Sequence, residues 1–338
     1  MALEILLLII GIALLYFGGE WLINGATTLA RRLGVPPLVV GLTVVAFGTS
    51  APELFVNTRA ALDGHGEISF GNIFGSNIAN IALILAICAI ITPLAIHKQL
   101  VRKTIPMLLA FTGLSIFMAL DPSRFADPVS KAAVQPGFER TDGLILLGLF
   151  VCFLYLTVLS TRSKKKKNLL PGQIEDVDNL VRDYSIGTCL LIIAASLGAL
   201  VGGAELAVGS AVAVAEIMGI SKAVIGLTVI AFGTSLPELA VCLLATRKGQ
   251  IDLAVGNVVG SNIFNLLLIM GVTSSIDKVP MPVDGQQDLI VAGWLVALLY
   301  LTALTQKRVA RAEGWVLIVI YFSYTIWRFL SAESVPAG

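Results

Sequence analysis

The sequence predicts an all-α polytopic membrane protein in which ten transmembrane helices form two inverted five-helix repeats. Of the 338 residues, 57% are hydrophobic and only 13% are charged, whereas a soluble domain carries roughly 25% charged residues. The chain contains ten apolar runs, each close to the roughly 20 residues with which a helix crosses a bilayer. A 14-residue motif also occurs twice, at residues 41–54 and 226–239, which indicates an internal duplication.

The apolar runs give the expected helices in chain order. They cover residues 3–30, 38–61, 71–93, 104–120, 142–160, 186–214, 221–245, 253–274, 288–305 and 313–331. The second and seventh runs contain Gly-Thr-Ser-x-Pro at 48–52 and 233–237. Because glycine and proline together disfavour a continuous helix, we expect these two helices to be broken near their middles.

Two halves and a basic linker follow from these runs. Residues 1–160 form the first repeat, 161–185 a linker that begins with Lys164–Lys167, and 186–338 the second repeat. The lysine run is interpreted as a topology anchor, with a lipid-headgroup site as the alternative. The N-terminus lacks a basic region and a cleavage site, so the first helix is expected to be retained.

The loop charges predict the orientation. Sixteen of the 23 basic residues fall in loops on the side that the chain reaches after its first helix. This side is therefore expected to be cytoplasmic, with both termini outside the membrane. Five helices precede the second repeat, so it enters the membrane inverted, which is typical of transporters that work by alternating access.

Each repeat carries the same two motifs. GLTVVAFGTSAPEL (41–54) corresponds to GLTVIAFGTSLPEL (226–239), and GNIFGSNIAN (71–80) corresponds to GNVVGSNIFN (256–265), always 185 residues apart. Thr49 and Ser50 lie four and three residues before Glu53, so one helical turn brings them together. Pro52 removes a backbone donor, and we expect carbonyls near Ala46 and Thr49 to be free to face a ligand.

The two motifs supply only hard oxygen donors. The candidates are Thr49, Ser50, Glu53, Ser76 and Asn80, with Thr234, Ser235, Glu238, Ser261 and Asn265 at the same spacing. Ca²⁺ takes 6–8 such oxygens, and Na⁺ could use the same oxygens singly. Zn²⁺ and Cu⁺ would prefer imidazole or thiolate ligands, and the four cysteines (88, 152, 189 and 242) lie in apolar runs typical of packing residues. No cofactor is expected.

Structural roles compete with these assignments. Small residues in membrane helices usually serve close packing, and Gly41, Gly71, Gly75 and their partners in the second repeat are interpreted in this way. A protonated, purely structural glutamate is the alternative for Glu53 and Glu238. Four asparagines could serve either helix-to-helix hydrogen bonds or ion contact: Asn72, Asn77, Asn257 and Asn262. Glu20 and Glu205, also 185 residues apart, are assigned a structural or interfacial role, with a place on the ion path as the alternative.

The paired motifs resemble the alpha-repeats of the calcium/cation antiporter superfamily, and most of all those of prokaryotic sodium/calcium exchangers. This resemblance implies four central ion sites, alternating access by sliding of the first and sixth helices, and electrogenic exchange of three Na⁺ for one Ca²⁺. It places Glu53 and Glu238 at the centre of the site. The other implied ion contacts are Thr49, Ser50, Ser76, Asn80, Thr234, Ser235 and Ser261, with the carbonyls of Ala46 and Ala231.

One position departs from part of the family. Asn265 stands where many relatives have Asp, a pattern that potassium-dependent exchangers resemble, and this argues against K⁺ co-transport. The GTSxPE motif differs from the GNxxE pattern of proton-coupled relatives. The expected function is therefore Na⁺-driven extrusion of Ca²⁺ across a bacterial inner membrane. The expected protein is a functional monomer in the lipid bilayer that binds no nucleic acid.

Three other functions remain open at this point. The first keeps the fold but couples Ca²⁺ or another divalent cation to H⁺ or K⁺. The second is a cation channel, which would need no counter-ion. The third is an intramembrane enzyme that uses the two carboxylates, although the surrounding hydroxyls and amides fit cation coordination better than hydrolysis.

Overall fold

A computed structural model describes residues 1–120, 136–164, 184–218, 233–282 and 285–333. Within these ranges, eight helices are long and apolar enough to cross a membrane. A ninth candidate is the pair Pro37–Thr49 and Ala51–Leu62, which is bent by 45° at its break. The predicted helical membrane protein is thus confirmed. The count of ten remains a prediction, because much of the expected helix 221–245 lies outside the described residues.

The first half of the chain is built from helices interrupted by single π-helical turns, labelled η. Its elements are α1 (Ala2–Leu33), α2 (Pro37–Val40), η1 (Gly41–Val45), α3 (Ala46–Thr49), α4 (Ala51–Leu62), α5 (Gly66–Ala79), η2 (Asn80–Leu85), α6 (Ala86–Ile91), β1 (Leu94–Ala95), η3 (Leu100–Thr104), α7 (Ile105–Leu120), β2 (Gly137–Phe138) and α9 (Arg140–Lys164).

The second half repeats much of this order. Its described elements are α10 (Ile186–Ile217), α13 (Leu236–Arg247), α14 (Ile251–Phe264), η7 (Asn265–Ile269), α15 (Met270–Ile276), β3 (Val279–Pro280), α16 (Gly285–Thr305), β4 (Arg308–Val309) and α17 (Arg311–Glu333). Both η2 and η7 begin at a candidate site residue, Asn80 and Asn265. Such π-helical turns are frequent at functional sites.

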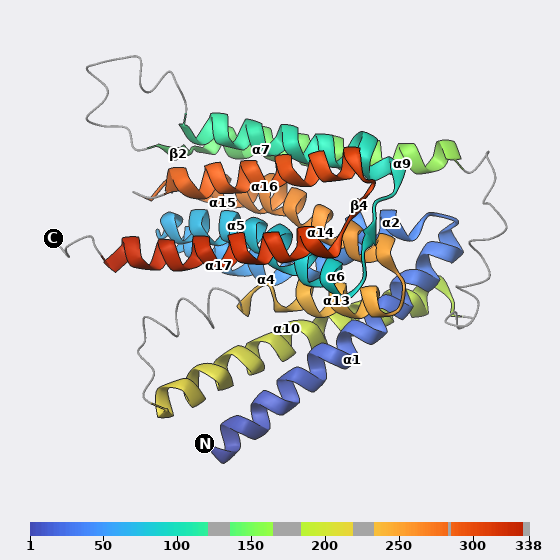
Figure 1. Cartoon of the computed structure of the whole chain (residues 1–338), viewed down its shortest axis with the longest axis horizontal. Helices are drawn as coiled ribbons and strands as arrows, with labels where there is room; N and C mark the ends of the chain where they lie inside the picture. Colours follow the sequence, from blue (N-terminus) through green and yellow to red (C-terminus); the bar gives the residue numbers. More distant parts are fainter. Residues whose placement is uncertain (121–135, 165–183, 219–232, 283–284, 334–338) are drawn as a thin grey trace.

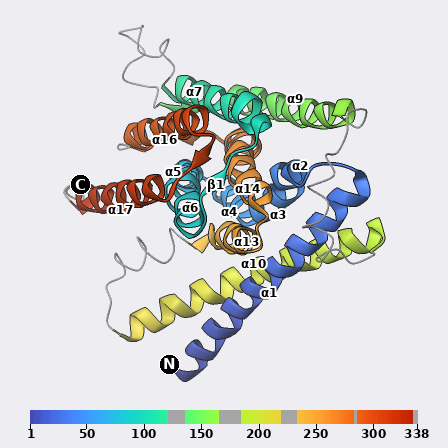
Figure 2. The same cartoon turned by 45° about the vertical axis from the view of Figure 1, so that its right-hand side comes forward.

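Two spans form the centre of the molecule. In the most apolar 18-residue stretch of each span, 83% of Gly66–Ile91 and 94% of Ile251–Ile276 is buried. The corresponding share for α17 is 11%. In Figure 1 and Figure 2, α1 and α10 lie together on one flank, inclined to the remaining helices, while α7, α9 and α16 lie on the opposite flank. The motif helices α3, α4, α5, α13 and α14 therefore lie between two outer layers.

The break in the second expected helix is confirmed and has a local cause. Ser50 interrupts the helical geometry with φ −86° and ψ 8°, and α4 then begins with Pro52 in its first turn. Proline is well suited to this position because its missing N–H would be unpaired there anyway. Ser235 has nearly the same angles (φ −89°, ψ 5°) before α13. The first part of the seventh expected helix lies outside the described residues.

The predicted glycine packing is confirmed where α14 meets η1 and α2. A Cβ atom at Gly41 would lie 2.8 Å from the Leu253 carbonyl oxygen, and one at Gly256 would lie 2.9 Å from the Leu38 oxygen. These close approaches need glycine on both helices. Gly71 and Gly75 meet no described atom within 4 Å. The residues that correspond to Leu38 and Leu42 in the repeat, 223 and 227, lie outside the described residues, so packing at Gly71 and Gly75 remains a prediction.

Two short antiparallel ladders join the halves crosswise. β1 pairs with β4, and β2 pairs with β3, so each ladder takes one strand from either half. In Figure 1, β2 lies at the left end of the helices and β4 near the right end. The first residues of α1 and the last residues of α17 lie toward the same end as β2.

Candidate functional site

Two glutamates occupy the centre of the candidate site. Glu53 lies in the first turn of α4 and Glu238 in the first turn of α13, and each is only 1% exposed. Helix N-termini favour negative charge because their first N–H groups point outward unpaired. Neither carboxylate forms an ion pair with a basic residue in the described parts of the chain, and the two are close enough for their charges to repel each other.

A direct hydrogen bond joins the two halves at this point. The Ser50 hydroxyl donates to Oε1 of Glu238 at 3.1 Å. The structure therefore brings the two motifs, 185 residues apart in the sequence, together at Ser50 and Glu238.

A second chain of contacts runs from Thr49 into α14. The Thr49 hydroxyl donates to Oδ1 of Asn257 at 3.1 Å, and Nδ2 of Asn257 donates to the Cys242 sulfur at 3.3 Å. Asn257 is fully buried. It fixes the direction of the Thr49 hydroxyl from the opposite half, a role that sequence reasoning left undecided.

Four asparagines form a symmetric set of hydrogen bonds between the two halves. Nδ2 of Asn80 donates to Oδ1 of Asn262, and Nδ2 of Asn265 donates to Oδ1 of Asn77, both at 3.0 Å. The side chains of Asn77 and Asn262 also reach each other's backbone oxygens at 3.5 and 3.4 Å. Asn77 and Asn262 therefore bridge helices, which settles that part of their ambiguity.

These bonds use the amide donors and leave the amide oxygens of Asn80 and Asn265 without a partner. Several other buried oxygens are likewise unpartnered among the described residues, and they come from both halves: Oε2 of Glu53 and Glu238, Oγ of Ser235 and Ser261, and Oδ1 of Asn80 and Asn265. Burying an unpaired polar oxygen costs about 1–3 kcal/mol. Oxygens of this kind can coordinate a cation, which would replace the missing hydrogen-bond partners.

The remaining predicted residues differ in their surroundings. Ser76 donates to Oδ1 of Asn72 at 3.3 Å, while Thr234 is half-buried beside Ser235. Ala231, whose carbonyl was expected to contact Na⁺, lies outside the described residues. No cluster of three or more His, Cys, Asp or Glu side chains that could hold a metal occurs in the described ranges. The donor set consequently consists of mixed carboxylate, hydroxyl and amide oxygens.

The expectation of a free Ala46 carbonyl is wrong. This oxygen accepts the Ser50 backbone N–H at 3.0 Å. The reason is one of spacing: Pro52 removes the donor that would bond the carbonyl four residues earlier, which is Gly48. The Thr49 hydroxyl also lies 3.4 Å from this oxygen. The second lone pair of the carbonyl can therefore face an ion only where the Thr49 hydroxyl donates to Asn257 instead.

The sequence of this chain matches a known protein family over most of its length. The family model described as sodium/calcium exchanger protein matches residues 3–159 and 188–330, which is most of the chain. The chain belongs to the sodium/calcium exchanger family. The resemblance seen in the paired motifs is thereby confirmed, and with it a transmembrane protein of ion transport.

Relatives that match most of this exchanger include bacterial and archaeal proteins. The chain is 34% identical over 277 residues to the inner membrane protein YrbG of Escherichia coli, covering 82% of this chain and 81% of that one. It is 28% identical to the sodium/calcium exchanger MaX1 of Methanosarcina acetivorans over 96% of this chain and 98% of the other.

Solved structures agree with this placement. The sodium–calcium exchanger NCX_Mj, soaked with 10 mM Na⁺ and no Ca²⁺, superposes with a TM-score of 0.79 at 32% identity, covering 95% of this chain and 97% of that one. The same protein soaked with neither ion gives a TM-score of 0.78. The fold of this exchanger is therefore that of NCX_Mj.

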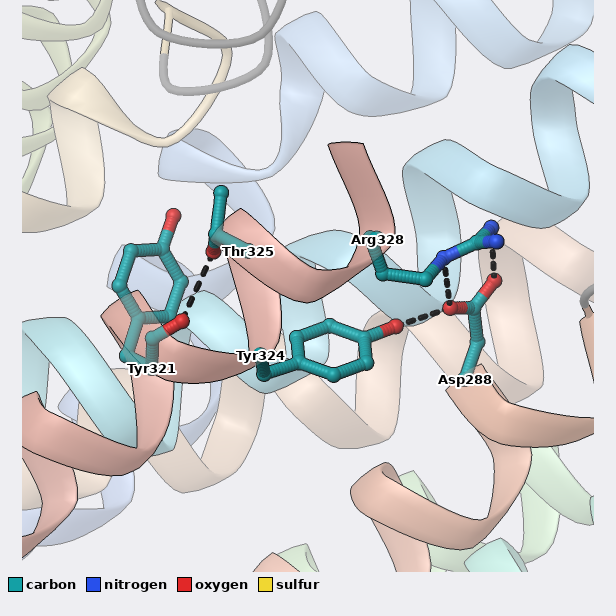
Figure 3. Close-up of polar contacts among 5 residues, drawn as sticks. All are labelled: Asp288, Tyr321, Tyr324, Thr325 and Arg328. Atoms are coloured by element: carbon teal, nitrogen blue, oxygen red, sulfur yellow. Dashed lines mark hydrogen bonds and ion pairs between the residues drawn. The ribbon is translucent and has the colours of Figure 1, made fainter. Parts of the chain in front are cut away.

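A buried ion pair elsewhere in the exchanger was missed by sequence reasoning. Asp288 at the start of α16 receives Nε and Nη2 of Arg328 at 3.0 and 3.2 Å, and the Tyr324 hydroxyl also donates to it (Figure 3). The side chain of Asp288 is 6% exposed. This carboxylate is thus neutralised by its own cation, unlike Glu53 and Glu238. The single sequence signal was an aspartate in an apolar run, since its partner lies 40 residues away.

Proposed function

We propose that this exchanger moves Na⁺ and Ca²⁺ in opposite directions by alternating access and extrudes Ca²⁺ across the bacterial inner membrane. Family membership supports cation antiport that involves Ca²⁺. The coupling to Na⁺, with three Na⁺ exchanged for one Ca²⁺ independently of K⁺, is the finer part of the proposal. The protein is an antiporter rather than an enzyme, works as a monomer in the lipid bilayer and needs no cofactor.

One observation carries the proposal: in the described parts of the chain, two buried carboxylates have no basic partner, and the same two motifs hold further buried oxygens that have no partner. Two carboxylates balance the charge of one Ca²⁺ ion, whose 6–8 oxygen ligands such a set can supply. The ion ligands in this proposal are Ala46, Thr49, Ser50, Glu53, Ser76, Asn80, Ala231, Thr234, Ser235, Glu238, Ser261 and Asn265.

The same charges account for coupling. With the site empty, closing it on both sides would bury two uncompensated negative charges, which is very costly at low dielectric. An empty transporter would therefore not change its access. One Ca²⁺, or several Na⁺, would cancel the charges and permit the change, so that each ion crosses only in exchange for the other.

Alternating access rests on two inverted repeats, residues 1–160 and 186–338, joined by the cytoplasmic linker 161–185, with both termini outside. Several features support this arrangement. α4 and α13, like α5 and α14, have the same length and are offset by 185 residues. The two β-ladders take one strand from each half, and α1 begins at the end of the molecule where α17 finishes (Figure 1).

Flux measurements with purified protein in lipid vesicles test the function. Vesicles loaded with Na⁺ and diluted into Na⁺-free medium should take up ⁴⁵Ca²⁺, whereas K⁺ or pH gradients alone should drive no uptake. Uptake driven by K⁺ or H⁺ would overturn the Na⁺ coupling. Unitary Ca²⁺ currents without a counter-ion would instead identify a channel.

Two variants test the site in the same assay. Glu53→Gln and Glu238→Gln each remove one negative charge at almost constant volume and should abolish uptake. Glu67→Gln is the matched control, because this side chain lies at the start of α5, is 53% exposed and should leave uptake unchanged. Full uptake by either site variant would contradict the assignment of Glu53 and Glu238.

A further inference from the structure

An ion pair outside the proposed ion site connects α1 to α13. Nζ of Lys248, at the C-terminal end of α13, donates to Oε2 of Glu20 on α1 at 2.7 Å. The same ammonium reaches Oδ1 of Asn24, one turn further along α1, at 3.4 Å. Both charged side chains are largely shielded, with 17% of Lys248 and 26% of Glu20 exposed. We call these three residues the α1 latch.

Close backbone packing accompanies the latch. A Cβ atom at Gly19 would lie 2.6 Å from Cδ1 of Leu244 on α13. Glycine therefore lets α1 approach α13 at the residue next to Glu20. The ion pair and the close approach belong to one docked arrangement of α1 on α13.

The 185-residue offset between the repeats defines an equivalent contact in the other half, which we call the mirror contact. Residues 185 apart are equivalent, so the mirror of α1 on α13 is α10 on α4. The ends of α4 and α13 correspond closely, because Asp63 and Lys248 follow their last residues and a left-handed glycine comes next, Gly64 at φ 79° and Gly249 at φ 72°.

The equivalent residues cannot form the same latch. Glu20 corresponds to Glu205, but Lys248 corresponds to Asp63, so the mirror contact brings two acidic residues together. Asn24 corresponds to Gly209, which has no side-chain oxygen. Gly19 corresponds to Ala204 on α10. The Ala204 methyl group fills the space that Gly19 leaves free on α1.

One cation is present near the mirror contact, but it is already engaged. Arg59, the equivalent of Leu244, holds Asp63 with Nε at 2.7 Å from Oδ2 on the exposed surface. In the mirror contact, the two carboxylates of Glu205 and Asp63 would share this one guanidinium. In the α1 latch, Lys248 pairs with one carboxylate, that of Glu20. The two contacts therefore differ in charge balance as well as in shape.

From this asymmetry we propose that the α1 latch holds the resting transporter in the access state in which α1 is docked on α13. The proposal rests on the alternating-access function proposed above, in which the two access states exchange the roles of the repeats. A ligand's apparent affinity is reduced by the fraction of molecules that are not in the competent state. The latch therefore sets the ratio of apparent Ca²⁺ affinities at the two faces of the membrane.

The test compares latch variants in oriented vesicles. Lys248→Met keeps the aliphatic stem and removes the charge, and it should change the ratio of Ca²⁺ KM values at the two faces by about fivefold. The double variant Glu20→Lys with Lys248→Glu should restore the wild-type ratio. Asp63→Lys gives Glu205 a partner in the mirror contact and should shift the ratio in the same direction as Lys248→Met. Arg247→Gln, at the exposed neighbouring position, should change nothing.

Distances measured without transport give an independent readout. Spin labels at Leu3 on α1 and Leu330 on α17, both exposed, should report two distance populations whose ratio Lys248→Met shifts toward the undocked one. Unchanged populations and an unchanged KM ratio, in protein that still exchanges Na⁺ for Ca²⁺, would overturn the latch. Loss of rescue by the charge swap would do the same. Absence of Na⁺-driven uptake by the wild type would instead overturn the proposed function.

Discussion

At the scale of single residues, the two central carboxylates have no cationic partner among the described residues, unlike three other acidic side chains. Asp288 has Arg328, Glu20 has Lys248 and Asp63 has Arg59. Glu238 instead receives the Ser50 hydroxyl, and Oε2 of Glu53 and of Glu238 has no partner among the described residues. A buried charge in such surroundings is best balanced by a bound ion, which is the physical basis of the proposed site.

Ser50→Ala is expected to raise the KM for Ca²⁺ by about tenfold, because a hydrogen bond to a charged group contributes about 1.5–3 kcal/mol. The hydroxyl also joins the two halves, so its removal acts on Glu238 rather than on its own helix alone. The measurement is Na⁺-driven ⁴⁵Ca²⁺ uptake at varied Ca²⁺. Ser196→Ala is the matched control, since this buried hydroxyl donates to the Ile192 carbonyl oxygen within α10. Equal KM values for both variants would contradict the role of Ser50.

At the scale of elements, the position of the site depends on how closely α14 packs against η1 and α3. Gly260 on α14 faces Leu42 and Ala46 at distances that leave no space for a side chain. Ala46 is itself a proposed carbonyl ligand, so the packing of these elements and the geometry of the site are linked. A shift of either helix would move ligands of both halves relative to each other.

Gly260→Ala should therefore lower both stability and transport. Its Cβ would lie 2.8 Å from the Ala46 Cβ and 2.9 Å from backbone atoms of Leu42, and overpacking of this kind costs about 1–3 kcal/mol. We expect a lower Tm in detergent and at least a tenfold loss of Ca²⁺ uptake. Gly113→Ala provides the comparison, because no described atom lies within 4 Å of its Cβ position on α7, and it should not lower either quantity. A Tm unchanged by Gly260→Ala would contradict the close contact.

The α16–α17 pair is expected to depend on its buried ion pair. Asp288→Asn removes the buried negative charge that Arg328 contacts and should destabilise the protein by about 3 kcal/mol, as the loss of one partner of a buried pair generally does. Unfolding of the variant in detergent measures the effect. Arg59→Gln breaks the ion pair with Asp63 on the surface, where the Arg59 side chain is 68% exposed. This variant should lower the free energy of unfolding by less than about 1 kcal/mol. Similar losses in the two variants would show that burial does not set the difference.

At the scale of the whole molecule, the outer and inner layers have different tasks. The two most buried spans carry four of the proposed ion ligands, Ser76, Asn80, Ser261 and Asn265, while α1 and α10 lie together on one flank (Figure 2). The contact of α1 with α13 includes the ion pair between Glu20 and Lys248, whereas the contact of α1 with α10 includes a close backbone approach between Gly11 and Gly203. A movement of this flank could therefore change access to the site without unfolding the centre.

The proposed stoichiometry makes transport depend on voltage. Exchange of three Na⁺ for one Ca²⁺ moves one net positive charge with Na⁺, and one charge across 100 mV corresponds to about 2.3 kcal/mol. In vesicles clamped with K⁺ and valinomycin, the Ca²⁺ ratio at equilibrium should change roughly 50-fold per 100 mV. A ratio that is independent of voltage would indicate electroneutral exchange of two Na⁺ for one Ca²⁺.

Much of the fold and the site could be predicted because it depends on local and repeated patterns. Apolar runs of bilayer length predict membrane helices, and Gly48 with Pro52 predicts the break before α4. The constant offset between the two motifs pairs Glu53 with Glu238. These features need no knowledge of which helices touch, because helix formation, helix breaks and the cost of a charge in hydrocarbon follow from neighbouring residues.

The tertiary structure alone decided which side chains meet across the fold. Asn257 bonding Thr49, Asp288 bonding Arg328 and Lys248 bonding Glu20 each join residues 40 to 228 positions apart. No periodicity in the sequence specifies such pairs, because they depend on the packing distance and rotation of whole helices. The duplicated motifs predict two equivalent halves, while the ion pair between α1 and α13 depends on residues that the two halves do not share.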